Sequence, residues 1–506
     1  MNNRIAYAKD MQKQVKHAGN ILLLGCGAIA RASLPLLFQL IDFDPKKLTI
    51  IDFADTRNTI TDYLNQGVIF KQEKITPENY KSILSRTLTK GDLLLDLSWN
   101  IDTCDLLTYC HEHGILYVNT SIEEWNPYQQ FATLHESTLY YRHQVIRKLL
   151  GNWHNTISQP TAILDHGANP GMISHLVKKG LCDIVTQKLI PSEKLVDHEK
   201  DSMLSYIKNN QFNLLAQKIG LKVVHISERD TQISNDPKKP DEFVNTWSVE
   251  GLIEEGLAPA ELGWGTHEKA LPPDAFTHPK GNRNQIFLKS RGMNTLMKSW
   301  IKSGPIIGML IRHGESYSIS DRLAVFPDEQ QTSYIHHPLR HHDRKLQALY
   351  RPTVHYVYCP SDSALASLHE FRMHNYERQK KQRILYNDII SGTDELGCLL
   401  MGDFGVWWVG SLLSIEEARA IIDPKKNKIN ATSLQVASSF VASAIYALRH
   451  PNVGICMADD IDHREILELA SPFWGEIWSG EIKLSPDEAQ KIREYQFEDF
   501  HVTEQQ

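Results

Sequence analysis

Short apolar runs alternate with longer amphipathic segments over the first third of the chain. The apolar runs predict buried strands at residues 21–24, 48–51, 91–98, 115–118 and 161–164. Segments with helical periodicity separate them, as at 102–111 and 128–150. Strands that alternate with helices predict an α/β fold with a parallel sheet and right-handed crossovers.

The first predicted strand runs directly into a glycine-rich turn. Gly25, Gly27 and Ala30 have the G-x-G-x-x-A spacing of a dinucleotide-binding turn, in which the glycines allow a tight turn and close approach to a pyrophosphate. Asp52 ends the second strand, roughly twenty residues later, where a carboxylate binds ribose hydroxyls. This context favours an NAD site on a Rossmann-type doubly wound sheet over a glycine-rich turn without a ligand.

Polar loops follow two further strands, at 96–100 and 119–124. Since ligands bind beyond the carboxyl ends of parallel strands, these loops are expected to line the cofactor crevice, although ordinary loop chemistry also fits them. The residues expected to bind NAD come from the glycine-rich turn, the second strand and these two loops. They are Gly25, Gly27, Ala28, Ile29, Asp52, Ser98, Thr120, Ser121 and Glu124.

A second helix N-terminus is predicted after the strand at 161–164. Residues 165–172 form a Gly/Pro-bearing loop, and a helix follows to Lys179. Pro170 suits the first helical turn and Asn169 suits the cap before it. Capping and catalysis explain Asn169 about equally well.

The alternating pattern stops near residue 180. Stretches at 354–358 and 399–409 indicate an antiparallel sheet, and 433–448 is an amphipathic helix. We predict three parts: an NAD-binding domain over 1–150, a large inserted α+β domain for substrate binding and dimerisation over 151–430, and a C-terminal helical segment over 431–506 that packs back on the first domain.

Composition excludes several classes of protein. At 506 residues, with 42% hydrophobic and 23% charged residues, the chain has the make-up of an ordinary globular protein of two or three domains. It has neither an apolar run long enough to span a membrane nor an export signal, and its seven scattered cysteines suit a reducing cytoplasm. A net charge of −7 without a basic block disfavours nucleic acid and suits a cationic ligand.

Residues 245–256 place an aromatic side chain among carboxylates. If the whole segment is helical, Glu250 and Glu254 lie near the face of Trp247, and Glu255 lies farther round the helix. Carboxylates beside an aromatic face suit a small dication, through charge neutralisation and cation–π contact. A partly buried tryptophan beside a solvated acidic face fits the same pattern, so the residues alone leave both interpretations open.

Two other motifs invite functional interpretations that their context does not support. Residues 312–315, Arg-His-Gly-Glu, match a histidine phosphatase signature but lie mid-chain, so His313 and Glu315 are interpreted as polar residues at the mouth of a substrate site. The histidines at 336–342 have a spacing that suits a metal, but Pro338 interrupts the helix that such a site needs. We therefore predict no metal.

The glycine fingerprint and four further segments resemble the bacterial homospermidine synthases, a saccharopine dehydrogenase-like family. The segments are Asp96–Asn100, His166–Gly171, Asn245–Gly251 and Ala260–Glu268, and the resemblance extends over about residues 18–480. It implies synthesis of homospermidine from two putrescines with NAD as a bound prosthetic group. A hydride passes to NAD, ammonia is lost, a second diamine forms a Schiff base, and the hydride returns. Spermidine is implied as an alternative donor that releases 1,3-diaminopropane, and a homodimer is implied as the assembly.

The resemblance also implies roles for individual residues. Trp247 would stabilise cationic species through its ring face, Glu228 and Glu255 would bind amines and transfer protons, and Asp96 and Asn169 would orient the reacting amine.

Outer residues that guide the diamine are implied at His313, Glu315 and Asp394. A saccharopine dehydrogenase-like oxidoreductase acting on an amino-acid or imine substrate is the alternative, but a substrate carboxylate needs a convergent Arg or Lys, whereas these segments offer acids, Trp and His. An NAD-binding regulator without activity is a further alternative.

Overall fold

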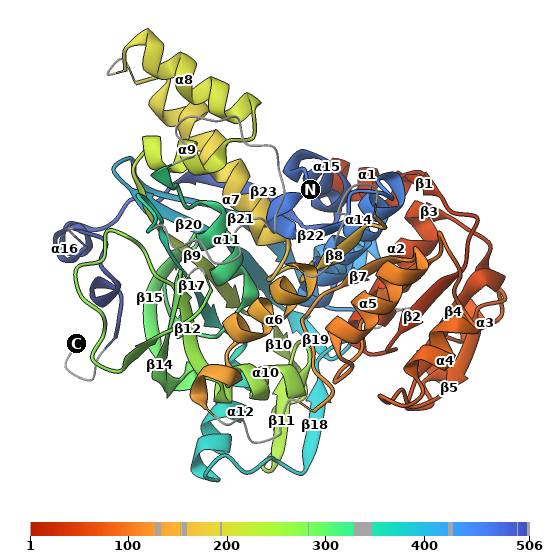
Figure 1. Cartoon of the computed structure of the whole chain (residues 1–506). Coiled ribbons are helices and arrows are strands. Elements are labelled where there is room, and N and C mark those ends of the chain that lie inside the picture. The colour runs from red at the N-terminus through yellow and green to blue at the C-terminus, as the bar shows by residue number, and fades with distance from the viewer. Residues whose placement is uncertain are drawn as a thin grey trace.

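The computed structural model describes residues 2–126, 133–151, 153, 159–192, 195–281, 283–327, 347–423, 429–492 and 494–502. Within them the chain forms two large sheets, which are seen in Figure 1 with the red and orange N-terminal unit beside the green and blue second unit.

The first sheet has seven parallel strands in the order β22-β8-β7-β6-β2-β4-β5. The strands are β2 (Ile21–Leu24), β4 (Leu48–Asp52), β5 (Ile69–Gln72), β6 (Leu93–Asp96), β7 (Leu116–Asn119), β8 (Ala162–Leu164) and β22 (Ile455–Met457). The order turns back at β2, whose neighbours are β4 on one side and β6 on the other, and this is where doubly wound sheets bind dinucleotides. The predicted α/β, Rossmann-type class is confirmed.

The first sheet extends beyond the predicted NAD-binding segment of 1–150. In chain order its sixth strand is β8, which lies beyond residue 150. Its seventh strand, β22, comes from the C-terminal part of the chain. The helices that connect or cover these strands include α2 (Ala28–Leu40), α4 (Tyr80–Ser85), α5 (Thr103–His113) and α6 (Leu139–Gly151).

The fingerprint turn has the geometry that its glycines predict. Gly25 has φ +83°, and a Cβ there would lie 2.5 Å from the carbonyl oxygen of Leu97. Gly27 precedes α2 without a side-chain cap, and a Cβ added to it would meet nothing within 4 Å. The space beside the start of α2 is therefore open, as a pyrophosphate site requires.

The second sheet has ten strands and is mixed. Its main path runs β13-β14-β12-β17-β9-β20-β21-β23, and off this path β16 pairs with β17 and β15 pairs with β16. The strands are β9 (Leu221–Asp230), β12 (Pro259–Gly263), β13 (Ala275–Thr277), β14 (Gln285–Arg291), β15 (Leu296–Ile301), β16 (Gly304–Met309), β17 (Thr353–Cys359), β20 (Thr393–Gly402), β21 (Gly405–Ser414) and β23 (Glu476–Glu481).

The prediction of an antiparallel sheet is confirmed at one of its two stretches and needs correction at the other. The stretch at 354–358 lies in β17, which pairs antiparallel with β12 and β16 but parallel with β9. The apolar run at 399–409 covers parts of two strands, β20 and β21, which pair antiparallel as predicted on either side of the turn at Asp403 and Phe404.

Helix α14 (Ala431–Arg449) lies between the two units, where it packs against α2 and β7 of the first and β20 of the second. Among the described residues it is the one helix long and apolar enough to cross a membrane, and 89% of its apolar window is buried inside the protein. The rest of the predicted C-terminal segment is divided, since β22 joins the first sheet whereas β23, Phe497 and Phe500 pack on the second.

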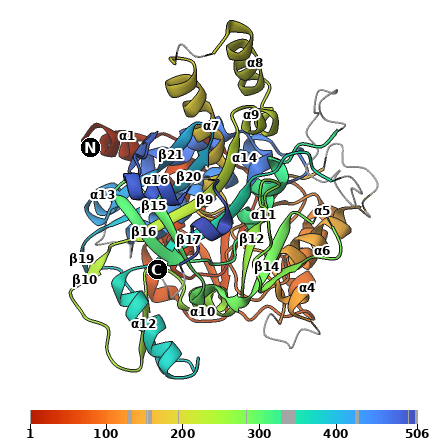
Figure 2. The ribbon, with the colours of Figure 1, turned by 90° about the vertical axis from the view of Figure 1, so that its left-hand side faces the viewer.

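Smaller elements extend from the two ends of the second unit. Figures 1 and 2 show α8 (Asp197–Lys208) and α9 (Phe212–Lys218) projecting at one end. At the opposite end, α12 (Asp362–Met373) lies beside the parallel pair β11 (Glu242–Asn245) and β18 (Lys381–Ile384).

We expect Gly25→Ala to destabilise the NAD-free protein by about 1–3 kcal/mol, because the new Cβ meets backbone at a left-handed φ. Thermal unfolding measures this. Gly27→Ala is the matched control, which adds the same methyl group in open space and should unfold at the wild-type temperature while binding NAD more weakly. Equal unfolding temperatures for the two variants would contradict the prediction.

Candidate functional site

Glu228, on β9, is the centre of a buried polar cluster. It is 3% exposed, and it accepts hydrogen bonds from Nδ2 of Asn169 at 2.9 Å and from the hydroxyl of Tyr356. Burial raises the pKa of Glu228 to about 7, while those two hydrogen bonds act in the opposite direction. A carboxyl group with a pKa near neutrality can both accept and return a proton.

Asn169 reaches Glu228 because it does not cap a helix. Helix α7 (Met172–Asp183) begins later than predicted, after Gly171, which has φ +128° and supplies no side-chain cap. Pro170 accordingly precedes the helix instead of occupying its first turn. The capping interpretation of Asn169 is wrong, and its amide is free to contact the carboxylate.

Trp247 lies in the turn between β11 and α10 (Val249–Leu257), not on the helix predicted over 245–256. Ser248 starts the helix by accepting a hydrogen bond from the amide of Gly251 at 3.0 Å. The indole packs on Gly251, where a Cβ would lie 2.6 Å from the ring, and its Nε1 donates to the hydroxyl of Tyr358 at 2.9 Å. The ring is thus held at its edge and supported on one side.

The three glutamates of α10 have different surroundings. Glu250 pairs with Arg378 at the surface. Glu254 binds Arg142 at 3.3 Å and Arg312 at 2.7 Å, so neither residue has the predicted place beside the Trp247 ring face. Glu255 alone of the three faces the cluster.

His313 connects Glu255 to Glu315. The Nε2 atom of His313 lies 3.6 Å from Glu255, its Nδ1 lies 3.4 Å from Glu315, and its ring lies 4.4 Å from that of Tyr356. Burial lowers the pKa of His313, but Glu255 and Glu315 outweigh burial and raise it to about 10, so the imidazole is positively charged.

His313 and Glu315 are more deeply placed than predicted. They are 5% and 1% exposed, so they form the floor of the cluster and not its mouth. His313 precedes α11 (Gly314–Arg322). Arg312 binds Glu254 and the carbonyl of Ser137, which gives the Arg-His-Gly motif a structural use.

Asp394 lies in a second layer of carboxylates behind Glu228. On β20 it pairs with Asp230 of β9, and both side chains are fully buried. Asp230 accepts from the hydroxyl of Thr246 at 2.7 Å, and Asp394 accepts from that of Thr432. Burial raises the pKa of both aspartates, and Glu228 raises that of Asp394 further.

Sequence reasoning missed Asp230, Tyr356 and Tyr358. A usable signal existed, because side chains two apart on a strand share a face. Asp230 follows Glu228 by two residues, and the two tyrosines alternate within the stretch at 354–358.

The residues predicted for the cofactor gather at the carboxyl ends of β2, β4, β6 and β7. Asp52 accepts from the amide of Cys26 at 2.6 Å and so joins the fingerprint turn. Asp96 is more enclosed than its predicted role implies, since it accepts from Tyr117 at 2.8 Å and Ser98 at 2.5 Å, and burial raises its pKa.

Of the remaining predicted cofactor residues, Ala28 and Ile29 begin α2 and Thr120 is half-buried beside Gly167. Ser121 donates to Glu123 at 2.8 Å, and Glu124 lies 3.4 Å from Arg142.

The histidines at 336–342 lie outside the described residues. In the part of the chain that the structure describes, no group of three or more His, Cys, Asp or Glu side chains is arranged to hold a metal ion.

Comparison with known proteins assigns the family. Residues 21–163 match the saccharopine dehydrogenase NADP binding domain, and residues 167–480 match the saccharopine dehydrogenase C-terminal domain. The homospermidine synthase of Mesorhizobium japonicum is 35% identical over 91% of this chain and 89% of its own. That of Blastochloris viridis is 37% identical over 91% of this chain and 90% of its own. The chain belongs to the homospermidine synthase family.

A solved member of the family has the same fold. The crystal structure of the Legionella pneumophila homospermidine synthase in complex with NAD is similar to this chain with a TM-score of 0.80 and 34% identity. The match covers 97% of this chain and 99% of the Legionella chain. The resemblance inferred from the sequence is confirmed.

We expect Glu254→Gln to lower the free energy of unfolding by about 3 kcal/mol, because two buried arginines lose their shared carboxylate. Glu250→Gln breaks one surface ion pair and should change it by less than about 1 kcal/mol. Urea unfolding of both variants tests this. A loss of similar size in the two would show that Glu254 is not a structural clamp.

Proposed function

We propose that this chain is a homospermidine synthase that joins two putrescines with NAD bound and releases ammonia. The observation that carries the proposal is a buried group of carboxylates, Glu228, Asp230 and Asp394, beside the indole of Trp247. Buried carboxylates favour positively charged ligands, and the relatives of 35% and 37% identity are homospermidine synthases.

The preference of the site for a cationic ligand favours this function over the alternative oxidoreductase. A substrate with a carboxylate needs a guanidinium or ammonium group to bind it. Arg142 and Arg312, which lie beside the cluster, are both bound to Glu254. The site therefore suits a diamine better than an amino acid.

The residues at the edge of the first sheet fit NAD. The uncapped start of α2 and the open space at Gly27 suit the pyrophosphate, and Asp52 suits the ribose hydroxyls. A carboxylate at that position repels a 2′-phosphate, which favours NAD over the NADP of the domain family's description. When bound, NAD accepts a hydride from the diamine and later returns it.

Glu228 is suited to prepare the diamine. A carbon gives up a hydride readily when it is next to a neutral amine, whereas a free alkylamine has a pKa near ~10. The Glu228 carboxylate can take the extra proton, because its pKa of about 7 keeps it partly ionised at neutral pH. Asn169 and Tyr356 fix its orientation through their hydrogen bonds.

Trp247 is suited to stabilise the cationic imine that forms. Its ring edge is fixed by Tyr358, and a desolvated cation–π contact contributes about 2 kcal/mol, which is about a thirtyfold effect on rate. Glu255, whose side chain is 24% exposed, can receive the ammonium group of the second diamine.

A cytoplasmic homodimer that binds neither nucleic acid nor membrane completes the proposal. All seven cysteines are free thiols, which suits a reducing compartment. The dimer rests on the family resemblance.

Purified protein incubated with putrescine should form homospermidine and ammonia in equal amounts, with no net NADH. Amine chromatography, an ammonia assay and absorbance of NADH measure the three quantities. Formation of stoichiometric free NADH without a triamine would show that the protein is a dehydrogenase and not a synthase. No conversion at all would favour the NAD-binding regulator without activity.

We expect Trp247→Phe to keep partial activity and Trp247→Ala to lose about thirtyfold in kcat, because Phe retains a ring face and Ala does not. Unfolding temperatures of both variants control for damage to the fold. Equal activity in the two variants would rule out a role for the ring face.

A further inference from the structure

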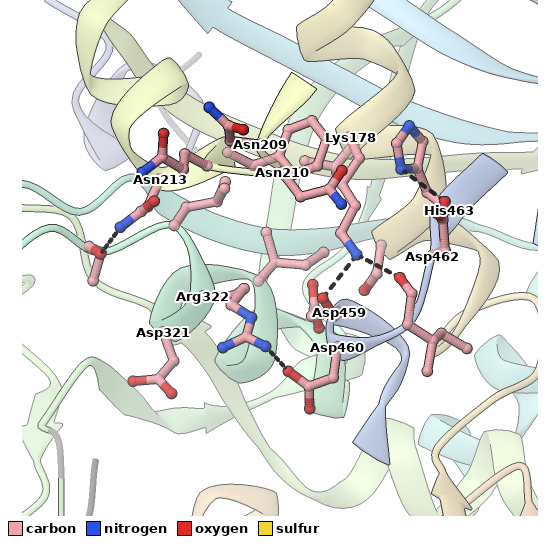
Figure 3. Close-up of a pocket in the computed structure, with 18 of the residues that line it drawn as sticks. Lys178, Asn209, Asn210, Asn213, Asp321, Arg322, Asp459, Asp460, Asp462 and His463 are labelled. Carbon is pink, nitrogen blue, oxygen red and sulfur yellow. Dashed lines mark hydrogen bonds and ion pairs between the residues drawn. The ribbon is translucent and has the colours of Figure 1, made fainter. Parts of the chain in front are cut away.

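Two cavities have in common the ion pair between Arg322 and Asp460, which lines both of them. The larger, of about 240 Å³, opens between α7, the end of α11 and residues 459–463 (Figure 3). Lys178 crosses its wall and donates to the carbonyls of Asp459 and Ile461 at 2.7 and 3.1 Å. The smaller, of about 30 Å³, is lined by residues that include His143 and Ser318.

The cavities are connected to the catalytic cluster through two helices. Helix α11 begins beside His313 and Glu315, and its next turn brings Ser318 to the smaller cavity. Helix α7 follows the Asn169 loop, and its Ser174 lines the larger cavity. Asp459 lines both cavities.

Several buried polar atoms near the cluster and the cavities have no hydrogen-bond partner among the described residues. The Oε2 atom of Glu315, Oδ2 of Asp459 and Oγ of Ser174 have no hydrogen-bond partner in the described part of the chain, although these residues are only 1%, 8% and 1% exposed. Buried polar atoms of this kind are normally satisfied by ordered water. The buried side of the cluster and the cavities therefore share polar atoms that ordered water can satisfy.

The proposed reaction needs a second way out of the site. When the second diamine attacks the imine carbon, a C–N bond forms to its neutral amine and the C–N bond to the first nitrogen breaks. The attacking nitrogen passes a proton to the first nitrogen, which leaves as neutral ammonia, while the lone pair of the attacking nitrogen forms a new C=N bond that keeps the positive charge, so charge and electrons balance. The incoming diamine occupies the exposed side at Trp247 and Glu255, whereas Glu315 lies on the opposite, buried side.

We propose that ammonia leaves through a passage that runs from Glu315 past Ser318 and Asp459 into the larger cavity. The smaller cavity has room for a molecule of the size of water or ammonia. The carboxylates along the passage favour the ammonium form. This inference rests on the proposed function.

The test compares two substitutions at Ser318, which lies outside the catalytic cluster. Ser318→Val fills the smaller cavity, whereas Ser318→Ala removes the same hydroxyl without adding volume. With putrescine as donor, Val should slow turnover about tenfold by retarding ammonia release, and Ala should stay within about twofold of wild type. With spermidine as donor the leaving group is 1,3-diaminopropane, which is much larger than ammonia and is expected to leave by the exposed side, so neither variant should slow turnover.

A second measurement follows ammonia in the opposite direction. Wild-type protein given putrescine and [15N]ammonium should incorporate 15N into the recovered putrescine, and Ser318→Val should lose most of this exchange. Two results would contradict the proposal that ammonia leaves through this passage. One is that Ser318→Val slows turnover equally with putrescine and with spermidine, and the other is that it incorporates as much 15N into putrescine as wild type. If Val fails to fold, Ser318→Thr adds a single methyl group and keeps the hydroxyl. Failure of wild-type protein to form any triamine would refute the proposed function instead.

Discussion

The burial of several carboxylates in one place is the constraint on which the site depends. Removing a carboxylate from water is unfavourable unless a hydrogen bond or a cation compensates it. Glu228, Asp230 and Asp394 receive hydrogen bonds from Asn, Tyr and Thr side chains, which offset part of this cost. A cationic amine can offset the remaining cost of burying these carboxylates, so the preference of the site for cationic ligands follows from electrostatics.

The second sheet makes such crowding possible because its central strands hold side chains at fixed spacings. Glu228 and Asp230 share one face of β9. The parallel register sets Tyr358 of β17 opposite Glu228, and the antiparallel register sets Asp394 of β20 opposite Asp230. Rigid neighbours prevent the acids from moving apart, which would otherwise relieve their repulsion and return their pKa values toward normal.

The parts of the molecule that could be predicted from sequence are those specified by local pattern. Apolar runs and glycine spacing identified the parallel sheet and the turn at Gly25, because each depends on a few consecutive residues. The surroundings of Asn169, Glu254 and His313 were misjudged, since each depends on partners more than fifty residues away. Family resemblance supplied roles that periodicity alone left undecided.

Helix α14 has a consequence for how the chain is made. It joins the fingerprint helix α2 to the strand that carries Asp394, and it also supplies Thr432 to that aspartate. The first sheet gains its last strand only with residues 455–457. A ribosome must therefore synthesise nearly the whole polypeptide before either half is complete.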